Sequence, residues 1–395
     1  MNMRKELSLK DFLIIGGLIF AGIVNVISPS LNSISLYGII PTLFLLALLF
    51  NKGVRTNKYQ KYVTLLCLWD LISCLWATSS MESFIEAKQM LGVFLLSFIF
   101  SAYVKKIRLI PYLYMTFMAL MIGCIIYASN HIVMSSELMS ATEQRLHDRT
   151  LDANTFAYYT FFCTFLIFIL ENEVKTLRVK SVFRVLFFLM IPFSFIIALL
   201  TASRQILIIQ IPLFFLLLYV RYFYNQNINK KVAVVFICSL FVFFILPTVL
   251  EIYNHSYLAE RAEVSIKEDS RFLLLKDAFT IGCKHFPLGV GAGNYIVHSY
   301  NAHFSHCTYV ELWANLGIVG LFIFLKLLYT YIRTQWKRFL LYKDKTYLSF
   351  LIFGLIFAFH NLFYVFYTGL WLMGFFILVA SHSETYYRKQ QLIAK

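Results

Sequence analysis

Residues 301–325, NAHFSHCTYVELWANLGIVGLFIFL, place a short polar segment directly before a long apolar run. Two histidines and a serine precede the run, and its first part holds two glycines three residues apart. An apolar stretch of about 20 residues is long enough to cross a bilayer as a helix. The stretch therefore predicts a membrane-spanning helix with polar chemistry gathered at one end.

The composition of the whole chain points to the membrane as well. The 395 residues are 60% hydrophobic and 14% charged, and the mean hydropathy is +0.72. Soluble domains average about 45–50% apolar and about 25% charged residues. A chain this long and this apolar cannot form one soluble core.

Apolar runs of about 17–25 residues, the length that spans a bilayer, recur along the chain. They centre near residues 20, 42, 70, 97, 118, 162, 192, 212, 241, 318, 357 and 374. Only a tight turn at Thr368 and Gly369 separates the last two, so eleven spans is the alternative. Because helices and closed barrels are the only spanning structures, we expect an all-α polytopic membrane protein with about 12 transmembrane helices, forming a single domain over residues 1–395.

The basic residues predict the orientation of these helices. Most of the 35 Lys and Arg residues fall in loops on the same side as the N-terminus, which the positive-inside rule places in the cytoplasm. The first apolar run, from Phe12, has no cleavage pattern after it and is expected to be the first span. We therefore expect a multi-pass membrane protein with both termini cytoplasmic. The topology accounts for the net charge of +15, and no nucleic-acid partner is expected.

Two segments on the external side are longer than a turn, residues 128–152 and residues 251–306. Within the larger one, RFLLLKDAFTIGCKHF (271–286) has apolar residues at helical spacing and predicts an amphipathic helix. PLGVGAGNY (287–295) then predicts a tight turn segment. Since polar groups are costly in membrane proteins and mark function, these loops are the predicted site, with 251–306 carrying part of it.

Arginines are the first candidate residues on this external side. Arg204 lies between two apolar runs in LLTASRQILIIQIP (199–212), where it is either an interfacial anchor or a guanidinium that binds an anionic, lipid-linked substrate. Arginine suits phosphate because its planar fork binds two oxygens and stays charged when desolvated. Arg145, Arg149 and Arg271 are the further candidates near helix ends.

Histidines are the second group of candidates. The spacing of His298, His303 and His306 is too loose to predict a metal site, and no cofactor is expected. His306 is favoured as a general base, because histidine titrates near neutral pH and Glu311 follows about one helical turn later. The alternative role for His306 is a hydrogen bond to the helix N-terminus.

Buried polar and sulfur groups have simpler interpretations. Asp70 is a carboxylate within an apolar run, where it is either a proton-relay group or, more simply, bonded to polar neighbours in the bundle. Five cysteines lie in apolar runs and are expected to be buried thiols. Cys283 and Cys307 are external and can pair, although two cysteines make no disulfide framework.

Four motifs together resemble the superfamily of O-antigen ligases and O-antigen or capsule polymerases. SHCTYVELWANLGIVGLFIFL (305–325) resembles its H-N-x-Y-L-x-x-L-x-x-x-G-x-x-G signature, and LTASRQILI (200–208) its S-R motif at a helix junction. DANTFA (152–157) resembles its D-P-N-x-x-A segment, and PLGVGAGNY its P-x-G-x-G-x-G loop. The resemblance covers about residues 60–380. Cys307 and Ala153 depart from it, replacing an asparagine and a proline.

The resemblance implies a GT-C-like helical bundle that catalyses inverting, metal-independent glycosyl transfer. It implies that His306, with His303 as the alternative, deprotonates the acceptor hydroxyl. It implies that arginines hold the pyrophosphate of an undecaprenyl-pyrophosphate-linked oligosaccharide, foremost Arg204, then Arg271, Arg149 and Arg145. Four residues of the motifs are expected to support the site: Asp152, Asn154, Gly291 and Glu311.

Three functions are compatible with these patterns. The favoured one is a polymerase that joins lipid-linked repeat units into a surface polysaccharide, with a flippase and a chain-length regulator as expected partners. A ligase that transfers the finished glycan to a lipid core or another acceptor is the alternative within the enzymes. A twelve-span transporter is the third, although the loop NKGVRTNKYQK (51–61) lacks the G-x-x-x-D-R-x-G-R-R pattern of major-facilitator carriers.

Overall fold

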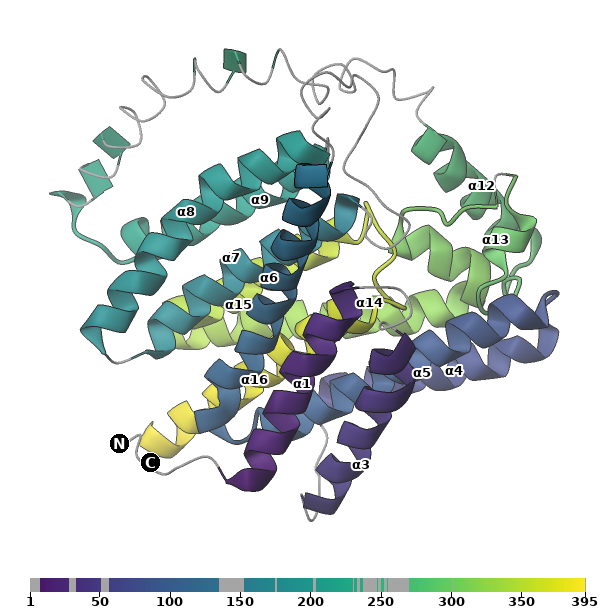
Figure 1. Cartoon of the computed structure of the whole chain (residues 1–395), viewed down its shortest axis with the longest axis horizontal. Helices are drawn as coiled ribbons and strands as arrows, with labels where there is room; N and C mark the ends of the chain where they lie inside the picture. Colours follow the sequence, from purple (N-terminus) through teal and green to yellow (C-terminus); the bar gives the residue numbers. More distant parts are fainter. Residues whose placement is uncertain are drawn as a thin grey trace. The chain divides into compact units, whose positions relative to one another are not determined.

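The computed structural model is built from helices throughout the part of the chain that it describes (Figure 1). The described residues are 8–27, 33–50, 57–134, 153–174, 176–201, 204–229, 270–300 and 302–394, with scattered positions between 231 and 254. The chain divides into two compact units. Unit 1 comprises residues 1–120, 266–335 and 357–395, and unit 2 comprises residues 121–265 and 336–356.

Unit 1 contains the N-terminal helices, the segment before residue 335 and the C-terminal helix. Its elements are α1 (Leu9–Ile27), η1 (Ser35–Ile39), α3 (Ile40–Phe50), α4 (Lys58–Ser73), η2 (Cys74–Trp76), α5 (Ser80–Tyr103), η3 (Ile107–Leu109), α12 (Ser270–Lys284), α13 (Tyr295–His298), α16 (Leu370–Ala394) and the first part of α14 (Thr308–Tyr342). Helix α5 packs against α4, α3 and α16. The α4–α5 hairpin and the segment from α12 to α14 frame the candidate site.

Side-chain caps fix where the hairpin helices begin. The Asn57 side chain accepts hydrogen bonds from the amides of Tyr59 and Gln60, both at 2.9 Å, at the start of α4. The Ser79 side chain accepts from the Glu82 amide at the start of α5. Asn and Ser at these positions satisfy amides that have no partner within the helix. The hairpin turn between them is therefore defined by local sequence.

Unit 2 is built around three helices, α7 (Ala153–Glu173), α8 (Leu177–Thr201) and α9 (Arg204–Leu218), with η4 (Tyr219–Phe223) continuing α9. Stacked rings fill it: Phe187 lies 4.8 Å from Phe214 at an interplanar angle of 16°. Glu171 is buried and pairs with Arg184 and Arg221. Burying a carboxylate requires such partners, so these ion pairs tie the three helices together at one end.

Three of the described helices have residues in both units. These are α6 (Ile110–Met134), α14 and α15 (Lys345–His360). Helix α6 reaches Met134, so residues 128–134 are helical and not part of a loop as predicted. Helix α12 confirms the predicted amphipathic helix, and turns follow it at residues 285–294 as expected.

The predicted number of about twelve membrane spans is not confirmed. Among the described residues, four helices are long and apolar enough to cross a membrane: Ser80–Tyr103, Leu177–Ala198, Gln205–Phe223 and Thr308–Tyr342. Shorter apolar helices cover Ser35–Phe50, Ile107–Gly123 and Lys345–His360. Every predicted centre except the one near residue 241, which lies outside the described residues, falls within a helix. The apolar runs therefore predicted correctly where helices lie. The length of each run did not predict which of these helices are long and apolar enough to cross a membrane.

Candidate active site

A tight turn over residues 302–308 places His306 directly before α14. His306 has a φ of 57°, a conformation uncommon for a residue with a side chain. Ser305 holds the turn from inside: its hydroxyl donates to the Cys307 carbonyl oxygen at 3.0 Å and accepts from the Cys307 amide at 3.3 Å. The Ser305 amide donates to Glu311 Oε2 at 2.6 Å. The Glu311 side chain therefore supports the turn by binding the backbone amide of Ser305.

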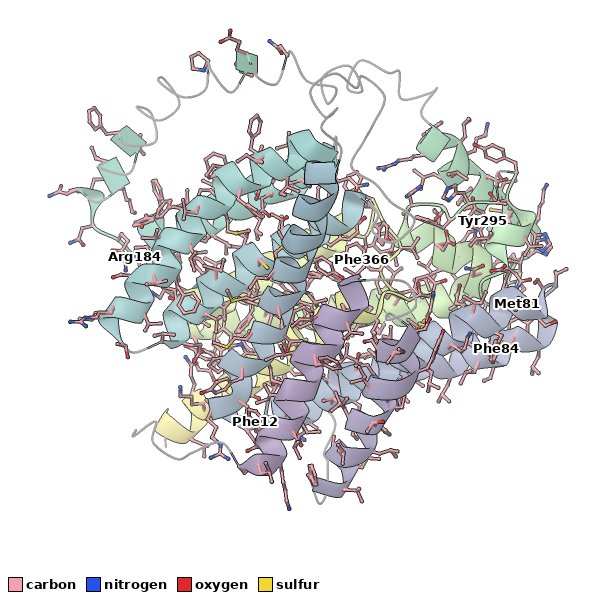
Figure 2. All side chains as sticks on the ribbon, viewed as in Figure 1. Phe12, Met81, Phe84, Arg184, Tyr295 and Phe366 are labelled. Carbon is pink, nitrogen blue, oxygen red and sulfur yellow. The ribbon has the colours of Figure 1, made fainter. Side chains whose placement is uncertain are left out.

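Thr308 joins this turn to the connection between α15 and α16. Its amide donates to the carbonyl oxygens of Asn361 at 2.9 Å and Tyr364 at 3.0 Å. Its hydroxyl donates to the Tyr364 carbonyl oxygen and accepts from the Phe366 amide, each at 2.8 Å. Because Thr308 and Phe366, which is labelled in Figure 2, are buried, water does not compete for these bonds. The two segments form one fixed surface.

Aromatic rings of both segments gather around His306. The Phe304 ring lies 4.3 Å from the His306 ring and 5.8 Å from the Tyr364 ring, edge-on to the latter. The His303 ring lies 6.0 Å from that of His306. His303 is exposed, and the other three side chains are half-buried. Both histidines predicted as the base thus share one partly open site.

The glycine-rich segment 287–294 lies along the first turns of α14. Three backbone hydrogen bonds join them, from Val290 N to Ala314 O at 2.8 Å, from Gly291 N to Asn315 O at 2.9 Å and from Ile318 N to Pro287 O at 3.0 Å. Gly317 makes this contact possible, because its φ of 63° and ψ of −160° interrupt the helix at that point. A Cβ there would lie 2.0 Å from the Pro287 carbonyl oxygen.

Gly291, predicted as a supporting residue, lies where this segment meets the α4–α5 turn. A Cβ at Gly291 would lie 2.7 Å from Ala77 Cβ and 2.9 Å from the Ser73 carbonyl oxygen. The next amide, of Ala292, donates to Ser73 Oγ at 3.0 Å. A glycine is required at 291 because only its bare backbone approaches the turn this closely.

Asn294 fastens the end of the segment to the same turn. Its Oδ1 accepts from the Ser79 amide at 2.6 Å, and its Nδ2 donates to Ser83 Oγ at 2.8 Å. Ser83 Oγ in turn donates to the Ala292 carbonyl oxygen at 2.9 Å. Figure 1 shows the outcome, with α13 and the start of α14 beside the ends of α4 and α5. The turn of the hairpin is therefore part of the support of the site.

A buried chain of hydrogen bonds lies beneath these segments, and the sequence did not predict it. Tyr367 OH donates to Glu86 Oε1 at 2.6 Å and accepts from Asn315 Nδ2 at 3.1 Å, while Asn315 Oδ1 accepts from the Tyr295 amide at 2.7 Å. Burial and the Glu86 carboxylate raise the pKa of Tyr367 well above its ordinary value, so the phenol keeps its proton. Asp70 adjoins Glu86 and is buried, but among the described residues neither of its carboxylate oxygens has a hydrogen-bond partner, so the predicted bonding to polar neighbours is not observed.

Helix α12 is attached to the same framework and carries Arg271 in its first turn. Tyr295 OH, labelled in Figure 2, donates to the Leu274 carbonyl oxygen at 3.0 Å, and Trp313 Nε1 donates to that of Phe279 at 3.2 Å. Arg271 is half-buried. Unit 1 therefore contains Arg271, His303, His306 and Glu311, which the sequence placed in one site.

The remaining predicted residues lie in unit 2 or outside the described residues. Arg204 is the first residue of α9, and two residues separate it from the last residue of α8, as the helix-junction motif predicted. Asn154 lies in the first turn of α7. Arg145, Arg149 and Asp152 lie outside the described residues. The positions of the backbone agree with the motifs, and the roles of these side chains stay predictions.

Cys283 and Cys307 do not form the disulfide that the sequence allowed. Cys283 is an exposed free thiol and Cys307 a buried one. Burial raises the pKa of the Cys307 thiol above its ordinary value. His298, the third predicted histidine, has its Nε2 3.2 Å from Thr78 Oγ1. Within the described ranges, no three His, Cys, Asp or Glu residues are grouped so as to hold a metal ion.

The comparison with known families adds an independent observation. No curated protein matches the chain. A family model described as O-antigen ligase matches residues 185–325, from within α8 to within α14. The matched range contains Arg204, Arg271, His303, His306 and Glu311, and it leaves out the DANTFA segment. The resemblance seen in the motifs is confirmed there: residues 185–325 of this apolar, helical chain are similar to the O-antigen ligase family.

Proposed function

We propose that the chain is a polymerase that joins lipid-linked oligosaccharide repeat units into a surface polysaccharide. The observation that carries this proposal is the family match over residues 185–325, which includes the turn bearing His306. The match supports activity of the O-antigen ligase and polymerase type in general. Polymerases and ligases share the four motifs, and polymerase is the function that we favour within that type.

The proposed reaction is an inverting transfer in which His306 is the general base and His303 the alternative. The base removes the proton of the acceptor hydroxyl as the acceptor oxygen bonds to the anomeric carbon. The bond from that carbon to the pyrophosphate oxygen breaks, and the leaving group takes the electron pair. The proton stays on the histidine until the product has left, and no metal is needed at any step.

Arginines are proposed to stabilise the leaving pyrophosphate. Arg204 is the foremost candidate, followed by Arg271, Arg149 and Arg145. Negative charge develops on the pyrophosphate as the glycosidic bond breaks, and preorganised guanidinium groups favour this transition state over the ground state. The Arg204 position at the start of α9 suits an anion, because the N-terminus of a helix carries partial positive charge.

The proposed setting is the external face of a bacterial inner membrane, with both chain termini in the cytoplasm. The proposed donor is an undecaprenyl-pyrophosphate-linked oligosaccharide. A lipid tail can remain in the bilayer while its pyrophosphate reaches a site at the membrane boundary. A flippase that delivers the donor and a chain-length regulator are the proposed protein partners.

A ligase is the second candidate, because the matching family model is described as O-antigen ligase. A ligase would use the same base and the same arginines. It would transfer a finished glycan to a lipid core or another acceptor instead of to the next repeat unit. The two enzymes therefore differ in the acceptor and not in the chemistry.

The test is a gel of the surface glycan from a deletion strain that carries wild type, His306→Ala or Arg204→Ala. His298→Ala is the matched control, because it removes an exposed histidine of the same external segment. We expect both site variants to reach the membrane at wild-type levels and lose the wild-type pattern, and the control to keep it.

The form of the loss separates the two candidates. Collapse of the ladder to single repeats means a polymerase. Loss of attached glycan while lipid-linked polymer accumulates means a ligase. An unchanged ladder in both site variants would refute the assignment of the site.

A further inference from the structure

The ring cluster beside His306 is built from two segments far apart in the sequence. Phe304 precedes α14, and Tyr364 lies between α15 and α16. Their rings are 5.8 Å apart at an interplanar angle of 79°, and Phe304 is 4.3 Å from the His306 ring. Two rings set edge to face beside a candidate base form a small angled wall.

The wall is held in place by backbone bonds that do not depend on the rings. Thr308 binds the Tyr364 carbonyl oxygen through both its amide and its hydroxyl, at 3.0 Å and 2.8 Å. The hydrogen bonds of the Ser305 amide and hydroxyl fix the backbone on the N-terminal side of His306. The ring positions are therefore set in advance, which lowers the entropy lost when a ligand binds. Both rings keep part of their surface exposed.

The two segments that carry the wall are aromatic and polar and contain no basic Lys or Arg side chains. Residues 302–311 and 360–369 contain no Lys or Arg, and they place His303 and His306 beside the rings. A pyrophosphate would seek cations, which this cluster does not offer. A sugar ring fits both features, because its C–H faces pack on aromatic surfaces while its hydroxyl edge needs hydrogen-bonding partners.

We propose that Phe304 and Tyr364 bind a sugar ring of the acceptor and hold its hydroxyl next to His306. This inference rests on the proposed glycosyl transfer and adds the residues that bind the acceptor. It assigns the acceptor to the ring cluster and leaves the charged end of the donor to the arginines. Removal of either ring weakens acceptor binding about tenfold, equivalent to about 1.4 kcal/mol.

The test measures binding directly, with the oligosaccharide repeat unit cut from the surface polysaccharide of the source strain as the probe. This free sugar has acceptor hydroxyls and no pyrophosphate. Saturation-transfer NMR is run on the full chain in lipid nanodiscs, with irradiation of the aromatic protons. The variants are Phe304→Leu and Tyr364→Leu, with Phe304→Tyr and Tyr364→Phe as variants that keep the rings. Phe363→Leu removes a ring from the same connection as a matched control.

The expected result is transfer to the sugar in wild type, in both ring-retaining variants and in Phe363→Leu. The two ring-removing variants bind about tenfold more weakly at an unchanged melting temperature. Absence of binding to wild type, or wild-type binding by Phe304→Leu and Tyr364→Leu, overturns the inference. A normal surface glycan from His306→Ala overturns the proposed function instead, so the two failures are distinguishable.

Discussion

Replacement of Gly317 by alanine is predicted to separate α14 from the glycine-rich segment. Gly317 has a φ of 63° and a ψ of −160°, a region that only glycine occupies without strain. The backbone term is therefore about 1–3 kcal/mol. The added Cβ would also lie 2.0 Å from the Pro287 carbonyl oxygen, and a backbone atom at that distance has to move.

Moving Pro287 breaks the hydrogen bonds that hold the segment to α14. The three bonds measure 2.8, 2.9 and 3.0 Å and contribute about 1 kcal/mol each. The full loss is about 4–6 kcal/mol if the segment detaches. We expect the melting temperature of the purified protein to fall by at least about 5 °C.

The melting temperature and the surface glycan are measured on the same variants. Gly16→Ala is the control, because no atom lies within 4 Å of the Cβ it adds within α1. We expect that control to melt at or slightly above the wild-type temperature, since alanine favours a helix interior over glycine. A Gly317→Ala protein that melts within about 2 °C of wild type and makes normal glycan would refute the reasoning.

Three further predictions concern a buried ion pair, the Glu311 carboxylate and two thiols. Asp11→Asn is expected to lower the free energy of unfolding by about 1 kcal/mol. The reason is that buried Asp11 pairs with the half-exposed Lys106 at 2.6 Å and the exposed Arg108 at 3.0 Å. An unchanged melting temperature would contradict this prediction. Glu311→Ala is expected to abolish glycan synthesis, because it removes the acceptor of the hydrogen bond from the Ser305 amide. Glu311→Gln is expected to keep partial activity, because its amide oxygen can still accept that bond. Equal activity of the two variants would count against the role of Glu311. In single-cysteine variants at pH 8, a membrane-impermeant maleimide is expected to label exposed Cys283 from the external side. Cys307 is expected to stay unlabelled, because burial raises the pKa of its thiol and only the thiolate reacts. Labelling of Cys283 only after lysis would contradict the proposed topology.

Local patterns in the sequence predicted the helices and turns of the site well. Apolar spacing located α12, and the glycines of PLGVGAGNY located the turns after it, because both signals act over a few residues. The junction at Arg204 was likewise visible as a polar interruption between apolar runs. The count of spans was less predictable, since hydropathy marks where apolar helices lie and not whether each is long enough to span the bilayer.

Contacts between distant segments could not be predicted. Thr308 and Tyr364 are 56 residues apart, and neither residue type signals the bond between them. Glu86 lies among polar residues at the start of α5, between Ser83 and Lys88, so nothing in the sequence distinguished it from a solvent-exposed carboxylate. Its partner Tyr367 is separated from it by 281 residues, so only the folded chain brings the two together. Conversely, Cys283 and Cys307 looked able to pair, yet one thiol is exposed and the other buried.

The most direct test of the account is turnover by the purified chain in nanodiscs that hold lipid-linked repeat units from the deletion strain. Product length and the released lipid pyrophosphate are measured for wild type, His306→Ala and His303→Ala at equal protein levels. The account predicts that wild type and His303→Ala make polymer and release lipid pyrophosphate together, and that His306→Ala does neither. A wild-type rate from His306→Ala would contradict it.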